Sequence, residues 1–262
     1  MGPKREEKTD LRLAFDEDTA NYDKYRPAYA PALFEELLAY AAPGKGKRAL
    51  EIGVGTGQAT LPILETGCSV TAVELGEHLA VYVRQKFSSY PAFQVVTGDF
   101  AEFSGGGFDL LYSATAFHWI PDDVGYPKAL DLLKSGGALA LFWNHPFVAR
   151  ADCPLHCEIQ KAYQKYRPAS TPPAEFRAED CTKILERLER YGFTDTRAKL
   201  FYQTRTLTAE EYICLLNTYS DHRALPEAAR RGLEGEIADA IRRFGGTLNI
   251  YDTMDLYLAR KP

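Results

Sequence analysis

Short apolar runs alternate with amphipathic segments through the first half of the chain. Each run has the length of a buried strand, and the segments between the runs repeat their apolar positions at helical spacing. The predicted strands cover residues 48–52, 69–74, 93–99, 108–114 and 136–144, and the predicted helices cover residues 31–42, 58–65, 78–87 and 126–134. Strands that alternate with helices indicate a parallel sheet with helices on both faces, and right-handed crossovers make that sheet doubly wound.

The pattern changes after Asn144. Helical segments with proline-containing loops run from about 154 to 192, and a strand with alternating apolar residues follows at 196–207. Two further helical segments, 209–216 and 226–244, precede a last alternating strand at 247–260. Two late strands joined by a long helical connection predict an antiparallel hairpin at the sheet edge, with a helical cap inserted into it.

These elements predict one α/β domain over residues 1–262, with a Rossmann-like, doubly wound, mostly parallel sheet of seven strands. No internal repeat or low-complexity segment divides the chain. We expect an N-terminal flap over residues 1–30, a ligand-binding core over 44–147 and a C-terminal half over 148–262. The helical cap occupies about 208–246 of that half.

Composition and charge narrow the classes of partner. The chain has 262 residues, of which 45% are hydrophobic, and its formal net charge is -5 with lysine and arginine spread among acidic residues. Without a basic surplus, nucleic acid is not an expected partner. No apolar run reaches the roughly 18 residues of a membrane span, and the charged N-terminus lacks the apolar segment of a secretory signal. We therefore expect a cytoplasmic protein without membrane association, either a monomer or a homodimer.

The cysteines agree with a reducing compartment. The five of them form an odd, scattered set that does not resemble a disulfide framework. Cys153, His156 and Cys157 lie close together in the chain, but they lack the second ligand pair that a structural zinc site requires. We therefore predict no metal site.

A glycine-rich loop follows the first predicted strand. Gly53, Gly55 and Gly57 let the backbone turn sharply and approach a ligand without Cβ clashes, and the next helix directs its N-terminal amides at that ligand. Glu74 ends the second strand, roughly twenty residues further on. At that position a carboxylate can accept hydrogen bonds from both hydroxyls of a ribose. The pattern predicts a nucleotide-like ligand at the carboxyl ends of the strands.

The glycine spacing separates two classes of nucleotide site. A dinucleotide fingerprint would end on Gly or Ala, but counting from Gly53 it ends on Gln58, and counting from Gly55 it ends on Thr60. The segment instead reads ExGxGxG, beginning at Glu51, and resembles the loop of class I S-adenosylmethionine-dependent methyltransferases. An NAD-dependent oxidoreductase is disfavoured by this register and by the lack of a recognisable hydride-site constellation.

The resemblance extends along the chain. Residues 98–100, Gly-Asp-Phe, look like the family's adenine-binding corner, and residues 113–119, SATAFHW, look like the segment that lines its methyl-transfer pocket. A bacterial and fungal small-molecule subgroup, which includes the trans-aconitate methyltransferase-like proteins, has a similar N-terminal pattern of Tyr22, Tyr25, Arg26 and Pro27. The resemblance implies S-adenosylmethionine as cofactor and a small-molecule methyl acceptor.

The resemblance also implies a set of cofactor-binding residues: Tyr22, Arg26, Glu51, Gly53, Gly55, Thr56, Gly57, Glu74, Asp99, Phe100 and Ser113. The loop residues would surround the methionine part of the cofactor, and Glu51 would support the loop and meet the ammonium through water. If the flap folds over the site, Tyr22 and Arg26 would be available to the cofactor's carboxylate or to an acidic acceptor.

The remaining implied roles concern the nucleoside and the reacting atoms. Glu74 would hold the ribose, Asp99 and Phe100 would hold the adenine, and Ser113 would line the pocket. Methyl transfer from a sulfonium is a displacement on an already activated carbon, so the protein chiefly aligns reactants and excludes water. A carboxylate acceptor needs no base; for a hydroxyl or carbon acid, His118 is the candidate because its neutral form exists at pH 7.

Two alternatives remain at this point. The flap's aromatic residues serve equally well as packing or as substrate contacts. A methyltransferase-like binding or regulatory protein without catalysis would carry the same cofactor loop.

Overall fold

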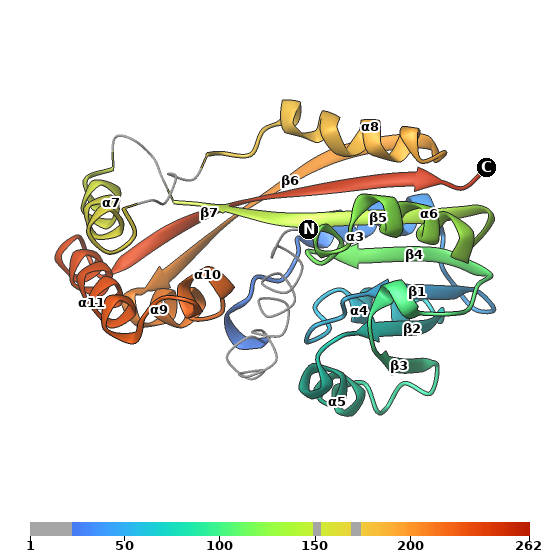
Figure 1. Ribbon diagram of the computed structural model, residues 1–262, viewed down its shortest axis with the longest axis horizontal. Coiled ribbons are helices and arrows are strands. Elements are labelled where there is room, and N and C mark those ends of the chain that lie inside the picture. The colour runs from blue at the N-terminus through green and yellow to red at the C-terminus, as the bar shows by residue number, and fades with distance from the viewer. Residues whose placement is uncertain (1–22, 149–152, 169–173) are drawn as a thin grey trace, which may run out of the picture.

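A single twisted sheet organises the protein (Figure 1). The computed structural model describes residues 23–148, 153–168 and 174–262. The strands are β1 Arg48–Ile52, β2 Ser69–Glu74, β3 Phe93–Thr97, β4 Phe108–Ala114, β5 Leu133–Phe147, β6 Thr194–Thr208 and β7 Thr247–Arg260. Their order is β3-β2-β1-β4-β5-β7-β6 in a 7-stranded sheet. The predicted doubly wound fold is thereby confirmed.

The direction of the strands creates a crevice at one edge of the sheet. β1 pairs in parallel with both β2 and β4, so the chain winds outward to opposite sides from β1. In such sheets, ligands bind outside the carboxyl ends of the strands where the winding reverses. β7 runs antiparallel between β5 and β6, as predicted for the late hairpin.

Helices cover both faces of the sheet. Their bounds are α3 Pro31–Ala41, α4 Thr60–Leu64, α5 Glu77–Lys86, α6 Asp122–Leu132, α7 Pro154–Tyr166, α8 Thr182–Arg190, α9 Ala209–Leu216, α10 Ser220–Arg223 and α11 Glu227–Arg243. One apolar layer joins α3, α4 and α5 to the sheet through residues such as Leu37 and Ile63. The opposite layer joins α6 and α8 to the sheet through residues such as Ala129 and Leu188. These layers hold the strand ends that form the crevice.

The cap is a third packing unit at the end of the long strands. α7, α9 and α11 share a separate apolar cluster that includes Ile159, Leu215 and Ile237. Figure 1 shows these helices and α10 gathered beside the ends of β6 and β7 that project beyond the parallel strands. The cap therefore includes α7 as well as the helices predicted between residues 208 and 246.

Several element bounds differ from the predicted ones, most of all those of α6 and β5. α6 begins at Asp122, four residues before the predicted start, because the acidic first turn favours a helix N-terminus although it lacks apolar periodicity. β5 continues to Phe147 because Pro146 and Phe147 still pair with Asp252 and Tyr251 of β7. In both places, contacts outside the local apolar pattern extend the element.

The described ranges hold neither a membrane-spanning helix nor a cluster of metal-binding side chains. There, no helix has both the length and the apolar composition for crossing a bilayer. Nor do any three His, Cys, Asp or Glu side chains of these ranges come together as a potential metal site.

Candidate functional site

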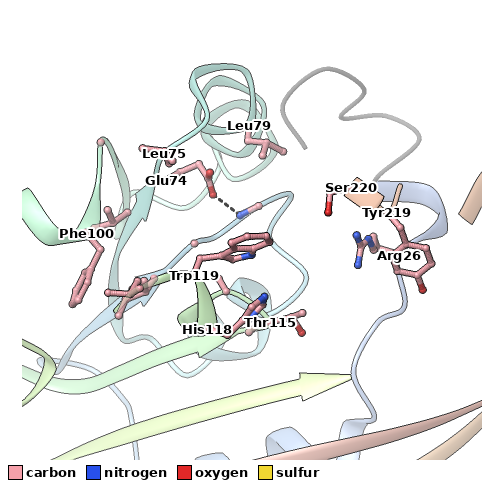
Figure 2. A pocket seen from close by; sticks show the side chains of 18 of the residues that line it. Arg26, Glu74, Leu75, Leu79, Phe100, Thr115, His118, Trp119, Tyr219 and Ser220 are labelled. Atoms are coloured by element: carbon pink, nitrogen blue, oxygen red, sulfur yellow. Dashed lines mark hydrogen bonds between the residues drawn. The ribbon is translucent and has the colours of Figure 1, made fainter. Parts of the chain in front are cut away.

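A cavity of about 280 Å³ lies at the carboxyl ends of the parallel strands. The ends of β1 and β2 supply Gly53 and Glu74, and the segment after β4 supplies Thr115 and His118. Figure 2 shows Glu74 and Phe100 on one side of this space and Arg26 and Tyr219 on the other. The cavity thus lies at the crevice that the strand order predicts.

Two loop glycines are required for different reasons. Gly53 has a φ of +67°, and a Cβ there would lie 2.4 Å from the Cβ of Ala116, so a side chain would collide with the segment after β4. Gly57 has a φ of +83°, and its Cβ would lie 2.4 Å from the ring of Phe87 on α5. Gly53 and Gly55 line the cavity. Gly57 instead permits close packing of the loop against α5, which differs from its expected cofactor contact.

Glu74 is fixed at the loop by two backbone amides. Its Oε2 accepts a 2.8 Å hydrogen bond from Gly55 N, and its Oε1 accepts a 3.0 Å hydrogen bond from Gly76 N. The residue is only 7% exposed, yet it lines the cavity. A carboxylate can accept more than two hydrogen bonds, so these backbone contacts are compatible with an additional hydroxyl donor. The arrangement therefore fits the predicted ribose contact.

Glu51 lies behind the loop in a buried position. Its Oε2 accepts hydrogen bonds of 2.7 Å from both Thr60 Oγ1 and Tyr112 OH. Burial raises the pKa of Glu51 to about 7, against the opposing effect of these two donors. The negative charge of Glu74 adds to the increase. Glu51 thus joins β1 to the start of α4 and to β4 on either side of the loop, and its pKa lies near neutral pH.

The predicted adenine corner is brought to the cavity only in part. Gly98 and Phe100 line the cavity, whereas Asp99 does not. The Oδ1 of Asp99 accepts a 2.9 Å hydrogen bond from Ala101 N and caps the short 3-10 helix that follows β3. One carboxylate oxygen of Asp99 therefore has a structural role in this turn.

Two other predicted cofactor residues lie outside the cavity. Ser113 is fully buried in β4, and its Oγ donates a 2.9 Å hydrogen bond to the backbone oxygen of Ile52. Thr56 is also fully buried, and its Oγ1 accepts a hydrogen bond from Gln58. These side chains stabilise β1 and the loop and line neither cavity, and their contact with the cofactor stays a prediction.

The residue after β4 is strained. Thr115 has a φ of +53°, which a β-branched side chain rarely adopts. Such a conformation costs about 1–3 kcal/mol and often marks a functional site. Thr115 N donates a 2.8 Å hydrogen bond to Phe142 O, and Thr115 Oγ1 lies 2.6 Å from Tyr29 OH. These contacts hold Thr115 at the cavity wall.

Residues 23–29, here called the strap, cross the cavity from the core to the cap. Asp23 accepts hydrogen bonds from Lys86 at 2.7 Å and from Tyr82 at 2.9 Å, both on α5. At the other end, Arg26 Nη2 donates a 2.7 Å hydrogen bond to Thr218 O, and its guanidinium lies 4.6 Å from the centre of the Tyr219 ring. Arg26 therefore lies at the cavity, as predicted.

The other flap residue in the predicted set, Tyr22, falls outside the residues that the structure describes.

His118 is oriented by a side chain that sequence reasoning missed. The indole Nε1 of Trp143 donates a 3.0 Å hydrogen bond to His118 Nδ1. Indole nitrogen is only a donor, so Nδ1 must be unprotonated and the neutral imidazole carries its proton on Nε2. In this state His118 offers a hydrogen-bond donor at Nε2, whereas the expected general base would need a lone pair there.

A second cavity of about 70 Å³ opens behind the loop. It shares Arg26, Gly53 and Thr115 with the larger cavity and adds Glu51 and Asn144. Its small volume suits a short polar extension of the ligand in the larger cavity.

Asn144 lines the small cavity from the end of β5. Its Nδ2 donates a 2.9 Å hydrogen bond to Oδ1 of the buried Asp252, which also accepts hydrogen bonds from Arg205. Because a carboxylate only accepts, the amide nitrogen of Asn144 must face Asp252. Asn144 Oδ1 is buried and has no hydrogen-bond partner among the described residues. A ligand with an N–H or O–H group would satisfy it.

Sequence reasoning missed Asn144 and Tyr219 as cavity residues, whereas Tyr29 is one of the flap aromatics for which a substrate contact was one of two alternatives. Asn144 ends a predicted strand at the same edge of the sheet as the glycine loop, and that position is a usable signal. Tyr219 lies in the cap and Tyr29 in the strap, so their approach depends on contacts between distant segments.

The fold and the site together define a nucleotide-type site on a doubly wound sheet, and the comparisons specify its class. Residues 50–141 match the family model of a methyltransferase domain. An uncharacterised methyltransferase of Schizosaccharomyces pombe is 24% identical over 229 residues, which cover 87% of this chain and 87% of the relative. Uncharacterised methyltransferases of Mycobacterium bovis and Mycobacterium tuberculosis also match, but the match covers only 54% of their length.

Solved structures agree with this assignment at the level of the fold. A type II methyltransferase from Anaeromyxobacter dehalogenans has a TM-score of 0.63 at 20% identity, covering 90% of this chain and 98% of that one. Phosphoethanolamine N-methyltransferase 2 of Haemonchus contortus, in complex with phosphomonomethylethanolamine and S-adenosylhomocysteine, has a TM-score of 0.54 at 18% identity. The alignment covers 96% of this chain and 60% of that protein.

Residues 50–141 thus form a methyltransferase domain by family and the whole chain has a methyltransferase fold, and the cofactor of such domains is S-adenosylmethionine. The resemblance inferred from the sequence is confirmed. The alternative of an NAD-dependent oxidoreductase is therefore dropped.

Proposed function

We propose that the chain is an enzyme that transfers a methyl group from S-adenosylmethionine to a small molecule. The observation that carries this proposal is the Glu74 carboxylate, held by Gly55 N and Gly76 N at the switch point of the sheet. The two backbone amides hold this carboxylate at the cavity wall, where it can also accept hydrogen bonds from the hydroxyls of a ribose.

The two cavities fit the two ends of such a cofactor. The larger cavity, with Glu74 and Phe100, would take the nucleoside. The smaller one, with Arg26, Glu51 and Asn144, would take the amino acid end. Arg26 suits a carboxylate, while the oxygens of Glu51 and Asn144 suit an ammonium group.

The cofactor, when bound, supplies a methyl group on a sulfonium, a carbon that is already activated. The residues of this chain then position the acceptor and exclude water, and such alignment can lower a barrier by about 7–11 kcal/mol in favourable cases. The strap and the cap close the cavity opposite the sheet through Arg26 and Tyr219. His118 can donate a hydrogen bond from Nε2 to the acceptor.

The enclosure also supports a small acceptor. Tyr219, Ser220 and Asp221 from the cap line the same cavity as Glu74. A polymer would have to displace these cap contacts, whereas a small molecule fits beneath them. The net charge of -5 offers no general attraction for nucleic acid.

Binding and turnover test different parts of this proposal. Calorimetry should show binding of S-adenosylmethionine and S-adenosylhomocysteine and little binding of NAD. Single-turnover transfer from methyl-labelled cofactor to a panel of small acceptors should then give labelled product. Cofactor binding without transfer to any acceptor would favour the non-catalytic alternative, and tight NAD binding alone would contradict the cofactor assignment.

A further inference from the structure

The cap contains a cavity of its own, with a volume of about 390 Å³. It lies among α7, α9, α10 and the first half of β7. Tyr219 and Asp221 line both this cap cavity and the 280 Å³ cavity at the strand ends. A ligand in the cap cavity would therefore lie next to the proposed cofactor site.

The walls of the cap cavity are largely apolar and aromatic. Leu215, Leu216 and Ile250 supply aliphatic surface, and all three are buried in the cap core. Tyr163 and Tyr212 add two rings to the same wall. Such walls favour a ligand with an apolar body of ring size, because its burial removes apolar surface from water.

One polar group in this wall is incompletely satisfied. His222 is only 4% exposed, and its Nε2 lies 3.0 Å from Tyr163 OH. Its Nδ1 is buried and has no hydrogen-bond partner among the residues that the structure describes. Burial holds the pKa of His222 well below its ordinary value, although the nearby charge of Asp221 opposes this shift. The imidazole is therefore neutral at physiological pH.

The charged groups of the wall neutralise each other. Arg167 and Asp221 both line the cap cavity, and Arg167 Nη1 lies 2.9 Å from Asp221 Oδ2. A carboxylate or phosphate entering this space would meet a cation that already has an anionic partner. It would also lose its hydration, which is costly without a compensating charge.

From this geometry we infer that the cap cavity is the acceptor pocket, and that the acceptor is an uncharged molecule with an apolar, ring-sized body and one polar group that hydrogen-bonds to His222 Nδ1. This inference rests on the proposed methyl transfer. It separates this chain from a phosphobase methyltransferase such as the Haemonchus contortus structure, whose ligand carries a phosphate.

The test uses two probes that differ mainly in charge, 4-methylphenol and 4-methylbenzoate. Both are titrated into the full chain, with and without S-adenosylhomocysteine, and dissociation constants are measured by ligand-detected NMR. We expect 4-methylphenol to bind about tenfold more tightly than 4-methylbenzoate, because the carboxylate of the benzoate must lose its hydration on binding. The imidazole nitrogen signals of His222, assigned with His222→Gln, should shift on adding the phenol.

Matched variants locate the binding site. Leu216→Trp fills the cap cavity and should weaken phenol binding by about tenfold or more, whereas Val81→Trp, at an exposed position of α5, should leave it unchanged. Thermal melting checks that Leu216→Trp still folds. Gln160→Trp, at a half-buried lining position, provides a second obstruction with less change to the core.

The outcomes are distinct. Equal or tighter binding of the benzoate, no phenol binding, an unmoved His222 signal, or unchanged binding in both obstructed variants would each overturn the neutral acceptor pocket. None of these results depends on S-adenosylhomocysteine affinity or on transfer of the labelled methyl group. A failure of that binding or of that transfer would instead overturn the proposed function.

Discussion

Trp143 fixes the tautomer of His118 by donating its indole N–H to Nδ1 across 3.0 Å. The two residues come from adjacent strands, since Trp143 lies in β5 and His118 follows β4. The proton of the neutral imidazole is thereby placed on Nε2. A proton on Nε2 would suit hydrogen bonding to an acceptor, whereas the general-base role inferred from the sequence would need a lone pair on that nitrogen.

The first prediction concerns how much each of these two roles of His118 would contribute to the reaction rate. Loss of one hydrogen bond costs about 0.5–1.5 kcal/mol, or roughly three- to tenfold, whereas loss of a general base costs about 10²- to 10⁴-fold. We expect His118→Gln, which keeps an N–H donor, to lower kcat/KM by no more than about tenfold. Steady-state kinetics with the identified acceptor decides, and a loss above about a hundredfold in a folded variant would restore the base.

Glu74 is the subject of the second prediction. A hydrogen bond to a charged group contributes about 1.5–3 kcal/mol, so Glu74→Ala should weaken S-adenosylhomocysteine binding by roughly ten- to a hundredfold. Glu77→Ala, an exposed acidic position in the first turn of α5, is the matched control and should bind normally. Calorimetry measures both variants. Wild-type affinity in Glu74→Ala would show that this carboxylate does not hold the ribose.

The third prediction concerns Asn144 and separates the two ends of the cofactor. If Asn144 Oδ1 accepts from the ammonium group, Asn144→Ala should weaken S-adenosylhomocysteine binding by about tenfold. Binding of 5′-methylthioadenosine, which lacks the amino acid end, should change little. Asn249→Ala, at an exposed position of β7, serves as control. Equal weakening of both ligands would argue that Asn144 supports the fold instead.

Much of the fold was predictable because local patterns and tertiary contacts agree there. β1 and β2 have the predicted bounds, since each is a short apolar run bounded by loop residues and buried on both faces of the sheet. β5 was predicted too short, because His145 and Pro146 lack an apolar pattern and are held in the strand by pairing with β7.

The sequence motifs predicted the cavity residues only at positions where the motif side chain or backbone faces the cavity. Gly53 and Glu74 reach the cavity because the strand ends carry them there. Ser113 belongs to the same motif-bearing segment, yet it points into the sheet and bonds to Ile52 O, which a motif without strand register does not reveal. Asn144 acquires its orientation from Asp252, a residue of a distant strand.

Glu51 gives the fourth prediction, on the pH dependence of stability. Its pKa is about 7 in the folded protein, compared with 4.5 for an ordinary glutamate. The folded state therefore binds more protons than the unfolded state between these values, and the stability contributed by Glu51 falls as pH rises through this window. The total loss is about 3 kcal/mol.

Glu51→Gln removes this titration while keeping a side chain of similar shape. Its free energy of unfolding, relative to the wild type, should increase as pH rises from about 4.5 to 7. Urea unfolding at several pH values measures the difference. Parallel stability profiles of the two proteins would show that Glu51 ionises normally in the folded state.

The final prediction is that the strap controls access to the cofactor cavity. Asp23 lines neither of the two cofactor cavities, but it ties the strap to α5 through Lys86 and Tyr82. The Lys86 and Asp23 side chains are 35% and 27% exposed, and an ion pair at the surface contributes about 1 kcal/mol to stability, so Asp23→Ala should remain folded. Loosening the strap should nevertheless speed tryptic cleavage after Lys24 and weaken S-adenosylhomocysteine binding several-fold, because closing segments are held by few contacts.

Bound S-adenosylhomocysteine should protect Lys24 in the wild type. The control is Glu158→Ala, which removes another surface ion pair far away in the chain. If Asp23→Ala matches that control in both cleavage rate and affinity, the strap has no gating role, and any effect of Arg26→Ala must come from direct contact with the cofactor.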